Sequence, residues 1–316
     1  MASPLISICI PAYKRIDYLK RLLDSISQQS FQNYEVIITD DTPDRSVRTY
    51  IESQSFSFEL KYIQNLQSKG TPQNWMEGIQ YASGEWIKIM HDDDWLTNKD
   101  SMREFVSAIC PEADCIFSGY VAAYEEQNRK VDKTISNSEF QKVKKDPYRL
   151  FASNVIGPPS VVLFRKNMHE RYDPNLKWLV DLEAYIRMLK NYNCFYISRP
   201  LITMSYNQTQ VTNDCFRNPD VEIPEALYYY QKHGSAVHHS LFAYDGWWRL
   251  FRNLDIRRPE QMNLYTSVKE IPAFIRHILS FHNMIPAFLL RWGPFSKVYM
   301  FLSYLLKNFR GIRHHH

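Results

Sequence analysis

Two groups of acidic residues stand where apolar, strand-like runs end. Asp92, Asp93 and Asp94 follow the run Glu85–Met90, and Asp40 and Asp41 end a second run that begins at Tyr34. Carboxylates this close together repel one another unless a cation or protons lie among them. Oxygen ligands suit Mg²⁺ or Mn²⁺, which usually bind one or two carboxylates together with substrate phosphates. The sequence therefore predicts a metal ion that bridges the protein to a phosphorylated ligand.

Strand-like runs alternate with helical patterns along residues 5–206. We expect strands at 5–10, 34–41, 58–63, 85–90, 115–124, 160–164, 194–197 and 201–206, and helices around 16–26, 72–82, 102–109 and 179–190. This alternation predicts an α/β fold with a mostly parallel sheet flanked by helices. Ligands of such sheets bind beyond the carboxyl ends of the strands, so both acidic groups should open onto one crevice.

Three motifs in this order resemble family 2 glycosyltransferases of the GT-A fold, a Rossmann-like fold. They are Pro11–Arg15 (PAYKR), Asp40–Asp44 (DDTPD) and the block Asn65–Trp95, with its spaced Lys69-Gly70, Asn74, Gly78, Ala82 and Gly84-Glu85. The resemblance implies a catalytic domain over residues 1–207, with a nucleotide-sugar half at about 1–110 and an acceptor half at about 111–207. Residues 208–313 would form a mainly helical extension, and 314–316 look like a tag remnant.

The resemblance places the donor nucleotide at the end of the first strand. Tyr13 would stack on the base, and Asp41 would hydrogen-bond the base edge. The implied nucleotide-binding residues are Pro11, Ala12, Tyr13, Arg15, Asp41, Lys69, Asn74 and Asp92.

The acidic triplet departs from the D-x-D pattern of the family. Counted from Gly84-Glu85, the first Asp of the family falls on His91, and its metal-binding carboxylate falls on Asp93. We expect Mn²⁺ or Mg²⁺ at Asp93, with Asp94 at the metal or its bound waters and Asp92 near the ribose or sugar. His91 would be either a second ligand or a substitution that holds the metal less tightly.

The family's catalytic pattern E-D-x-x-x-x-x-R reads Val180 to Arg187 here, so Asp181 takes the position of the catalytic base and Val180 replaces the preceding Glu. A base must be an unprotonated carboxylate within hydrogen-bond reach of the acceptor hydroxyl. One-step attack would invert the anomeric centre. Trp178, Glu183 and Trp95 are the expected sugar or acceptor contacts, and Glu183 is the alternative base.

The resemblance implies transfer of one sugar from a UDP- or dTDP-sugar to a glycan or lipid-linked glycan, in the assembly of bacterial capsule or lipopolysaccharide. One alternative is a catalytically degenerate nucleotide-sugar-binding scaffold, which His91 and Val180 motivate. Another is a sugar-phosphate nucleotidyltransferase, but that class needs a glycine-rich loop where this chain has PAYKRIDYLK.

Charge is distributed unevenly along the chain. All 34 acidic residues precede Ile271, whereas six Lys and Arg residues follow it. No apolar run in this tail reaches the roughly 20 residues that a membrane-spanning helix needs. We expect the tail either to bind an anionic membrane surface or to be buried in a homodimer or against the catalytic domain, with the membrane favoured. The predicted location is therefore the cytoplasmic, inner face of the cell membrane. Nucleic acid is not an expected partner, because the basic residues are not spread over the folded body.

Overall fold

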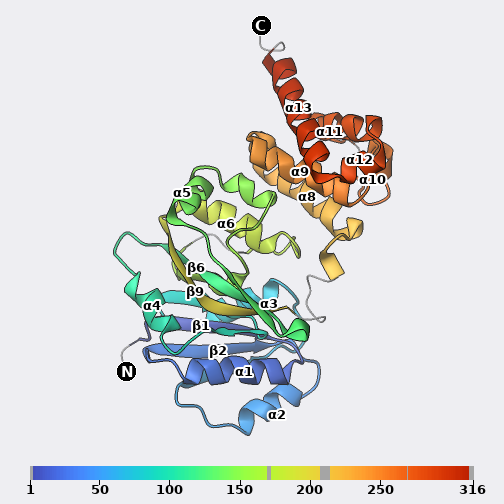
Figure 1. Cartoon of the computed structure of the whole chain (residues 1–316). Helices are drawn as coiled ribbons and strands as arrows, with labels where there is room; N and C mark the ends of the chain where they lie inside the picture. Colours follow the sequence, from blue (N-terminus) through green and yellow to red (C-terminus); the bar gives the residue numbers. More distant parts are fainter. Residues whose placement is uncertain (1–2, 169–171, 207–213, 269, 313–316) are drawn as a thin grey trace. The chain divides into compact units, whose positions relative to one another are not determined.

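The computed structural model describes residues 3–168, 172–206, 214–268 and 270–312, and the chain divides into two compact units. The first unit comprises Met1–Lys144 and Val155–Gln210, and the second comprises Lys145–Asn154 and Val211–His316 (Figure 1). The boundary that the sequence predicts between residues 207 and 208 lies outside the described residues.

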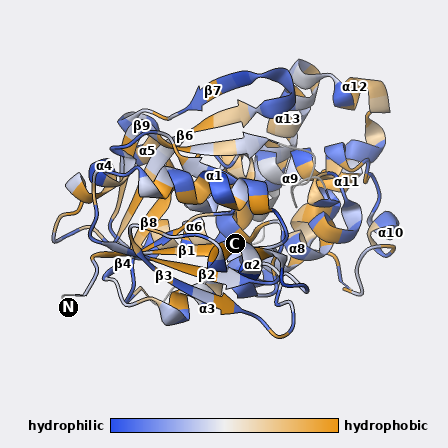
Figure 2. Ribbon diagram, turned by 90° about the horizontal axis from the view of Figure 1, so that it is seen from below, coloured by the Kyte–Doolittle hydropathy of each residue, from blue (hydrophilic) through white to orange (hydrophobic). Residues whose placement is uncertain are grey.

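One half of the sheet in the first unit is parallel. Its strands are β1 (Ile6–Ala12), β2 (Tyr34–Asp40), β3 (Glu59–Gln64) and β4 (Trp86–Ile89), in the order β3-β2-β1-β4. Their connections run through α1 (Ile16–Ser27), α2 (Ser46–Glu52) and α3 (Gln73–Tyr81). Every residue of β2 is buried, as its near-continuous apolar run predicts for a strand covered on both faces. Figure 2 shows hydrophobic colours along β1 and β2.

The other half of the sheet mixes directions. It contains β5 (Asp94–Leu96), β6 (Cys115–Tyr124), β7 (Arg129–Lys133), β8 (Val162–Arg165) and β9 (Cys194–Tyr206). β6 pairs in parallel with β9 but antiparallel with β7 and β8, so the whole sheet is mixed. The two strands predicted at 194–197 and 201–206 are one strand, β9, whose register with β6 shifts around Gly119. Helices α4 (Ser101–Ser107), α5 (Asn137–Lys145) and α6 (Val180–Asn191) complete this half.

The glycine of the Gly84-Glu85 motif is required by packing. A Cβ at Gly84 would lie 2.7 Å from the backbone nitrogen of Ser7 and 2.8 Å from the carbonyl carbon of Ile6. No side chain fits between the start of β4 and the start of β1, so this motif residue positions a strand.

The second unit is helical. Its helices are α8 (Pro219–His233), α9 (Leu241–Asn253), α10 (Pro259–Met262), α11 (Ala273–Met284), α12 (Ala287–Arg291) and α13 (Gly293–Ile312), together with the short 3₁₀ segments Pro147–Phe151 and Gly234–His238. The aromatic rings of Phe151, Tyr229, Trp247 and Phe274 pack against one another in its core. Among the described helices, none combines the length and the hydropathy needed to cross a bilayer. The predicted α/β fold with a mainly helical C-terminal extension is confirmed.

The buried carboxylate of Glu35 joins residues near the N-terminal ends of the parallel strands. Glu35 on β2 is 1% exposed and accepts hydrogen bonds of 2.6 Å from the Ser7 hydroxyl, from both the amide and the hydroxyl of Ser83, and from the Lys61 ammonium. Burial alone would raise the pKa of Glu35, but these bonds outweigh burial and lower the pKa from 4.5 to about 2.

We expect Glu35→Gln to lower the free energy of unfolding by about 2–3 kcal/mol at neutral pH, because an amide cannot replace the charged acceptor of Lys61. The folded-state pKa of Glu35 is depressed, so its contribution is complete above the unfolded pKa of 4.5 and is lost as the pH falls toward 2. Urea unfolding at neutral and acidic pH measures both effects. Glu59→Gln is the matched control, because this exposed carboxylate lies 3.8 Å from the same ammonium. An equal loss in the two variants would contradict the assignment.

Candidate active site

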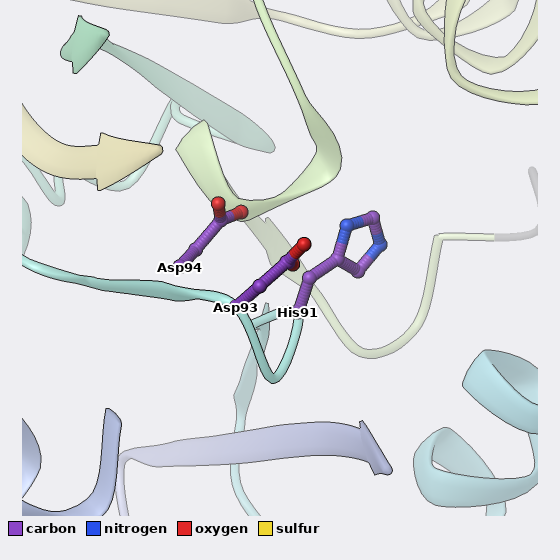
Figure 3. Close-up of side chains that lie close together, drawn as sticks. All are labelled: His91, Asp93 and Asp94. Carbon is purple, nitrogen blue, oxygen red and sulfur yellow. The ribbon is translucent and has the colours of Figure 1, made fainter. Parts of the chain in front are cut away.

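The turn between β4 and β5 gathers three side chains that can bind a metal ion. His91, Asp93 and Asp94 each offer one ligand atom, and these atoms lie within 4.8 Å of one another. A backbone hydrogen bond of 3.0 Å from the Asp94 amide to the His91 carbonyl closes the turn. Figure 3 shows the three side chains leaving the same loop toward a common space. The two carboxylates are 6% and 2% exposed, so they are clustered in a buried environment.

The chemistry of this triad fits a divalent cation. His91 Nε2 is buried and has no hydrogen-bond partner among the described residues. Burial, which outweighs the attraction of Asp93, lowers the pKa of His91 to about 4, so its ring is neutral and carries a free lone pair. Burial and the neighbouring carboxylate of Asp93 also raise the pKa of Asp94. Such a site is stabilised when a cation supplies the missing positive charge.

Ser160 holds two members of the triad in place, a role that the sequence did not indicate. Its hydroxyl accepts a hydrogen bond of 3.0 Å from the His91 amide and donates one of 2.5 Å to the Asp94 carboxylate. Its carbonyl accepts a hydrogen bond from the buried ammonium of Lys88 on β4. The preceding Gly157 has φ +117°, and a Cβ there would lie 2.6 Å from the ring of Tyr120. The glycine and its two prolines therefore form a rigid turn that delivers Ser160.

Asp92, the remaining acid of the triplet, points to a different partner. Its carboxylate accepts hydrogen bonds from the guanidinium of Arg15 and, at 3.3 Å, from the Tyr13 amide. Arg15 also donates to Asp93 at 2.8 Å. The guanidinium therefore bridges Asp92 to the triad and partly neutralises both carboxylates. Arg15 lies in the turn after β1, where Lys14 adopts φ 64°.

Asp41 shapes the loop that follows β3. Its carboxylate accepts hydrogen bonds from the Asn65 side chain at 2.7 Å, the Lys69 amide at 3.1 Å and the Gly70 amide at 2.7 Å. Asn74 is buried and joins the Asn65 side chain to the Thr39 carbonyl, with both bonds at 3.0 Å. These contacts with the loop and with β2 engage the Asn74 amide. Its predicted contact with the nucleotide stays a prediction, as does that of Lys69, whose ammonium pairs with Glu77 at 2.5 Å.

The end of β1 lies between the two acidic groups. The Asp41 amide donates to the Ala12 carbonyl at 3.0 Å, and the next residue, Tyr13, donates its amide to Asp92. Pro11 pairs with Thr39 of β2 in register. The Tyr13 ring is 48% exposed. Asp41 and Asp92 therefore contact adjacent residues, Ala12 and Tyr13, at the carboxyl end of β1, and the ring of Tyr13 is accessible.

Helix α6 approaches the triad from the other half of the sheet. Asp181, in its first turn, accepts a hydrogen bond of 2.8 Å from the Leu182 amide. Tyr185 of this helix is fully buried, and its hydroxyl has no partner among the described residues. Burial raises the pKa of Tyr185, and the carboxylates of Asp181 and Asp94 raise it further. Both carboxylates therefore raise the pKa of the same buried phenol, Tyr185 of α6.

The three other residues predicted to contact the sugar or the acceptor substrate are Glu183, Trp95 and Trp178, and they differ in burial and in partners. Glu183 is fully buried and holds Arg187 through two bonds of 2.8 Å, so its geometry argues against an acceptor or catalytic role. The Trp95 ring lies under the Arg21 guanidinium at 3.7 Å, next to the groove of α1 rather than the triad. Trp178 is half-buried just before α6. All three roles stay predictions.

Comparison with known proteins agrees with this geometry. A family model described as Glycosyl transferase family 2 matches residues 7–173, more than half of the chain. The putative glycosyltransferase EpsH of Bacillus subtilis is 25% identical over 241 residues, which are 75% of this chain and 63% of EpsH. The GalNAc(5)-diNAcBac-PP-undecaprenol beta-1,3-glucosyltransferase of Campylobacter jejuni is 30% identical over 95 residues, 29% of this chain and 31% of that protein. The matches therefore span less than two thirds of the length of these two relatives.

Two solved structures share the fold. Staphylococcus aureus TarS 1-349 in complex with UDP-GlcNAc has a TM-score of 0.56 at 16% identity, covering 88% of this chain and 87% of TarS 1-349. The mannosyltransferase PcManGT from Pyrobaculum calidifontis, in complex with GDP-Man and Mn²⁺, has a TM-score of 0.54 at 14% identity, covering 98% of this chain and 88% of PcManGT. At these identities the likeness concerns the fold alone, and it confirms the predicted GT-A architecture.

We expect Ser160→Ala to raise the dissociation constant for Mn²⁺ about tenfold, because His91 and Asp94 both lose the hydroxyl that orients them. Isothermal titration of Mn²⁺ into each variant measures the effect. Ser118→Ala is the control, since this equally buried hydroxyl donates only to the Gly119 carbonyl. The role of Ser160 is refuted if both variants bind Mn²⁺ as the unmodified protein does.

Proposed function

The chain belongs to glycosyl transferase family 2, and from this membership and the site we propose a metal-dependent, inverting transfer of one sugar. The donor is a nucleotide-diphosphate sugar, and the acceptor is a glycan or a lipid-linked glycan in bacterial surface polysaccharide assembly. The observation that carries this proposal is the cluster of His91, Asp93 and Asp94 in the turn after β4. The catalytic domain would comprise residues 1–207, with the donor half at about 1–110 and the acceptor half at about 111–207.

Asp93 and Asp94 would hold Mn²⁺ or Mg²⁺, with His91 as a third ligand. The ion, when bound, would neutralise the charge that grows on the departing diphosphate. PcManGT in complex with GDP-Man and Mn²⁺ supports such an ion in this fold. The imidazole favours Mn²⁺, because Mg²⁺ strongly prefers oxygen ligands. In this site His91 completes the donor set and does not by itself indicate a degenerate scaffold.

The donor nucleotide would lie at the ends of β1 and β2. The half-exposed Tyr13 ring offers a stacking face to the base. The Asp41 amide is hydrogen-bonded to the carbonyl of Ala12, the residue that precedes Tyr13. Arg15 would place its positive charge beside the diphosphate, because it already contacts Asp92 and Asp93. UDP or dTDP is the proposed nucleotide, and TarS with UDP-GlcNAc supports a uridine donor for this fold.

Asp181 would act as the general base. Its carboxylate would remove the proton from the acceptor hydroxyl as the oxygen attacks the anomeric carbon, while the bond from that carbon to the diphosphate breaks. One displacement from the opposite face inverts the anomeric centre. Val180 is 3% exposed, so the residue that departs from the family pattern fills an apolar position beside the proposed base.

A lipid-linked acceptor would bring the enzyme to the cytoplasmic, inner face of the cell membrane. The Campylobacter jejuni relative, whose name specifies an undecaprenyl-diphosphate-linked glycan, supports this acceptor class.

We expect Asp93→Asn to abolish the Mn²⁺-dependent rise in melting temperature that UDP or dTDP produces, because a neutral amide binds the ion weakly. Thermal unfolding with UDP, dTDP and GDP, each with and without Mn²⁺, tests the metal and ranks the bases together. Asp132→Asn, an exposed aspartate on β7, is the control and should respond like the unmodified protein. A nucleotide response that does not depend on metal in any variant would refute the metal site.

Asp181→Asn should lower the transfer rate by about 10²–10⁴-fold while the dissociation constant for the donor nucleotide stays unchanged. The asparagine retains the Oδ1 atom that accepts from the Leu182 amide, so the helix start is preserved. Sugar transfer to an isolated acceptor fraction and nucleotide release are the two measurements. Glu183→Gln distinguishes the two carboxylates. If this variant folds and loses transfer while Asp181→Asn remains active, the base is misassigned.

A further inference from the structure

Helix α13 presents its polar side to the interior of the second unit and its apolar side to water. Ser296 and Ser303 are fully buried, and Met300 is the buried apolar residue between them. At 3.6 residues per turn, the opposite side of the helix carries the exposed apolar residues Val298, Phe301 and Leu302, and the exposed Leu306 lies on its flank. This orientation is the reverse of that found in an ordinary surface helix, whose apolar stripe faces the core.

Specific hydrogen bonds hold α13 in this orientation. The indole nitrogen of Trp248 donates to the Ser296 hydroxyl at 2.9 Å, and the hydroxyls of Tyr244 and Ser303 are 2.7 Å apart. One turn further along, the Lys307 ammonium donates to the His238 carbonyl at 2.9 Å. Rotation of the helix to bury its leucines would break all three contacts and leave the buried indole unpaired.

The outward side is apolar over a long stretch of chain. Val298 is 58% exposed, and Phe301, Leu302 and Leu306 are 44–47% exposed. The preceding helix α12 and its end add Phe288 and Trp292, which are 72% and 59% exposed. Single exposed apolar residues are common, but such a series along neighbouring helices indicates a surface that binds a partner. We name this set, from Phe288 to Leu306, the outward apolar series.

The charges near the outward apolar series select the partner. No acidic residue follows Glu270, and Arg276 and Lys297 are exposed in this part of the chain; Arg291 is also exposed and pairs with Asp255 at 3.4 Å. A second copy of the chain in a two-fold contact would bring these cations against the same cations of its partner. An anionic lipid surface instead attracts them, and Trp and Phe side chains suit the boundary between headgroups and acyl chains.

We propose that α12 and α13 form a membrane-binding surface that lies on an anionic bilayer, with the outward apolar series inserted among the headgroups. The inference rests on the proposed location at the membrane but not on the proposed reaction. The apolar side chains supply the insertion energy, and the basic residues confer the preference for anionic lipid. The helices lie on the bilayer surface and do not cross it.

Vesicle flotation of the full chain tests this proposal. The probes are phosphatidylcholine vesicles with and without phosphatidylglycerol, at low and at high salt. The unmodified protein should float with anionic vesicles and should be released as salt screens the charges. The triple variant Phe301→Gln, Leu302→Gln and Leu306→Gln should partition at least about tenfold more weakly, because three inserted side chains are lost without a change of charge.

Leu264→Gln is the matched control, since this leucine is 76% exposed in the same unit but lies outside the outward apolar series. Its flotation should equal that of the unmodified protein. The proposal is overturned if the unmodified protein does not float, if the triple variant floats equally, or if light scattering shows a dimer that the triple variant abolishes. Nucleotide release from the donor, measured without vesicles, reports the reaction separately, so a failure of one proposal is distinguishable from a failure of the other.

Discussion

Three consecutive carboxylates can be buried together only if other groups offset their negative charge, and this constraint organises the first unit. Asp92 is neutralised by Arg15 from the turn after β1, and Asp94 is held by Ser160 from the approach to β8. Asp93 shares the same guanidinium and remains close to a neutral imidazole. The triplet therefore draws in residues from distant parts of the chain, and its remaining negative charge is what a divalent ion would balance.

Several motif residues make contacts that stabilise the fold of the protein itself. Gly84 permits the contact between two strands, and the Asn74 amide joins β2 to the loop that Asp41 holds. Lys69 contributes its amide to Asp41 and its ammonium to Glu77. A motif can thus be specific for a family because it builds the loop after β3, even where the side chain itself contacts only protein.

The sequence predicted those parts of the site that follow from strand order. Asp41 and Asp92 lie near one another because parallel strands end at the same edge, and that rule needs only local patterns. The contacts of Ser160 with His91 and Asp94 join residues 66 or more positions apart, and no local spacing indicates such a pairing. The mixed half of the sheet was missed for a similar reason, because apolar runs do not specify the direction of pairing. In α13 the sequence shows an apolar pattern, but the orientation of the helix depends on hydroxyl and indole partners in α9.

The single hydroxyl of Ser160 has a mechanical consequence. It belongs to the segment from Gly157 to Val161, whose backbone is restricted by the Tyr120 ring and by two prolines. Through this hydroxyl the segment is bonded to the backbone amide of His91, which follows β4, and to the carboxylate of Asp94 at the start of β5. A displacement of this segment would therefore shift His91 and Asp94 together. The geometry of the triad thus depends on the position of the segment that precedes β8.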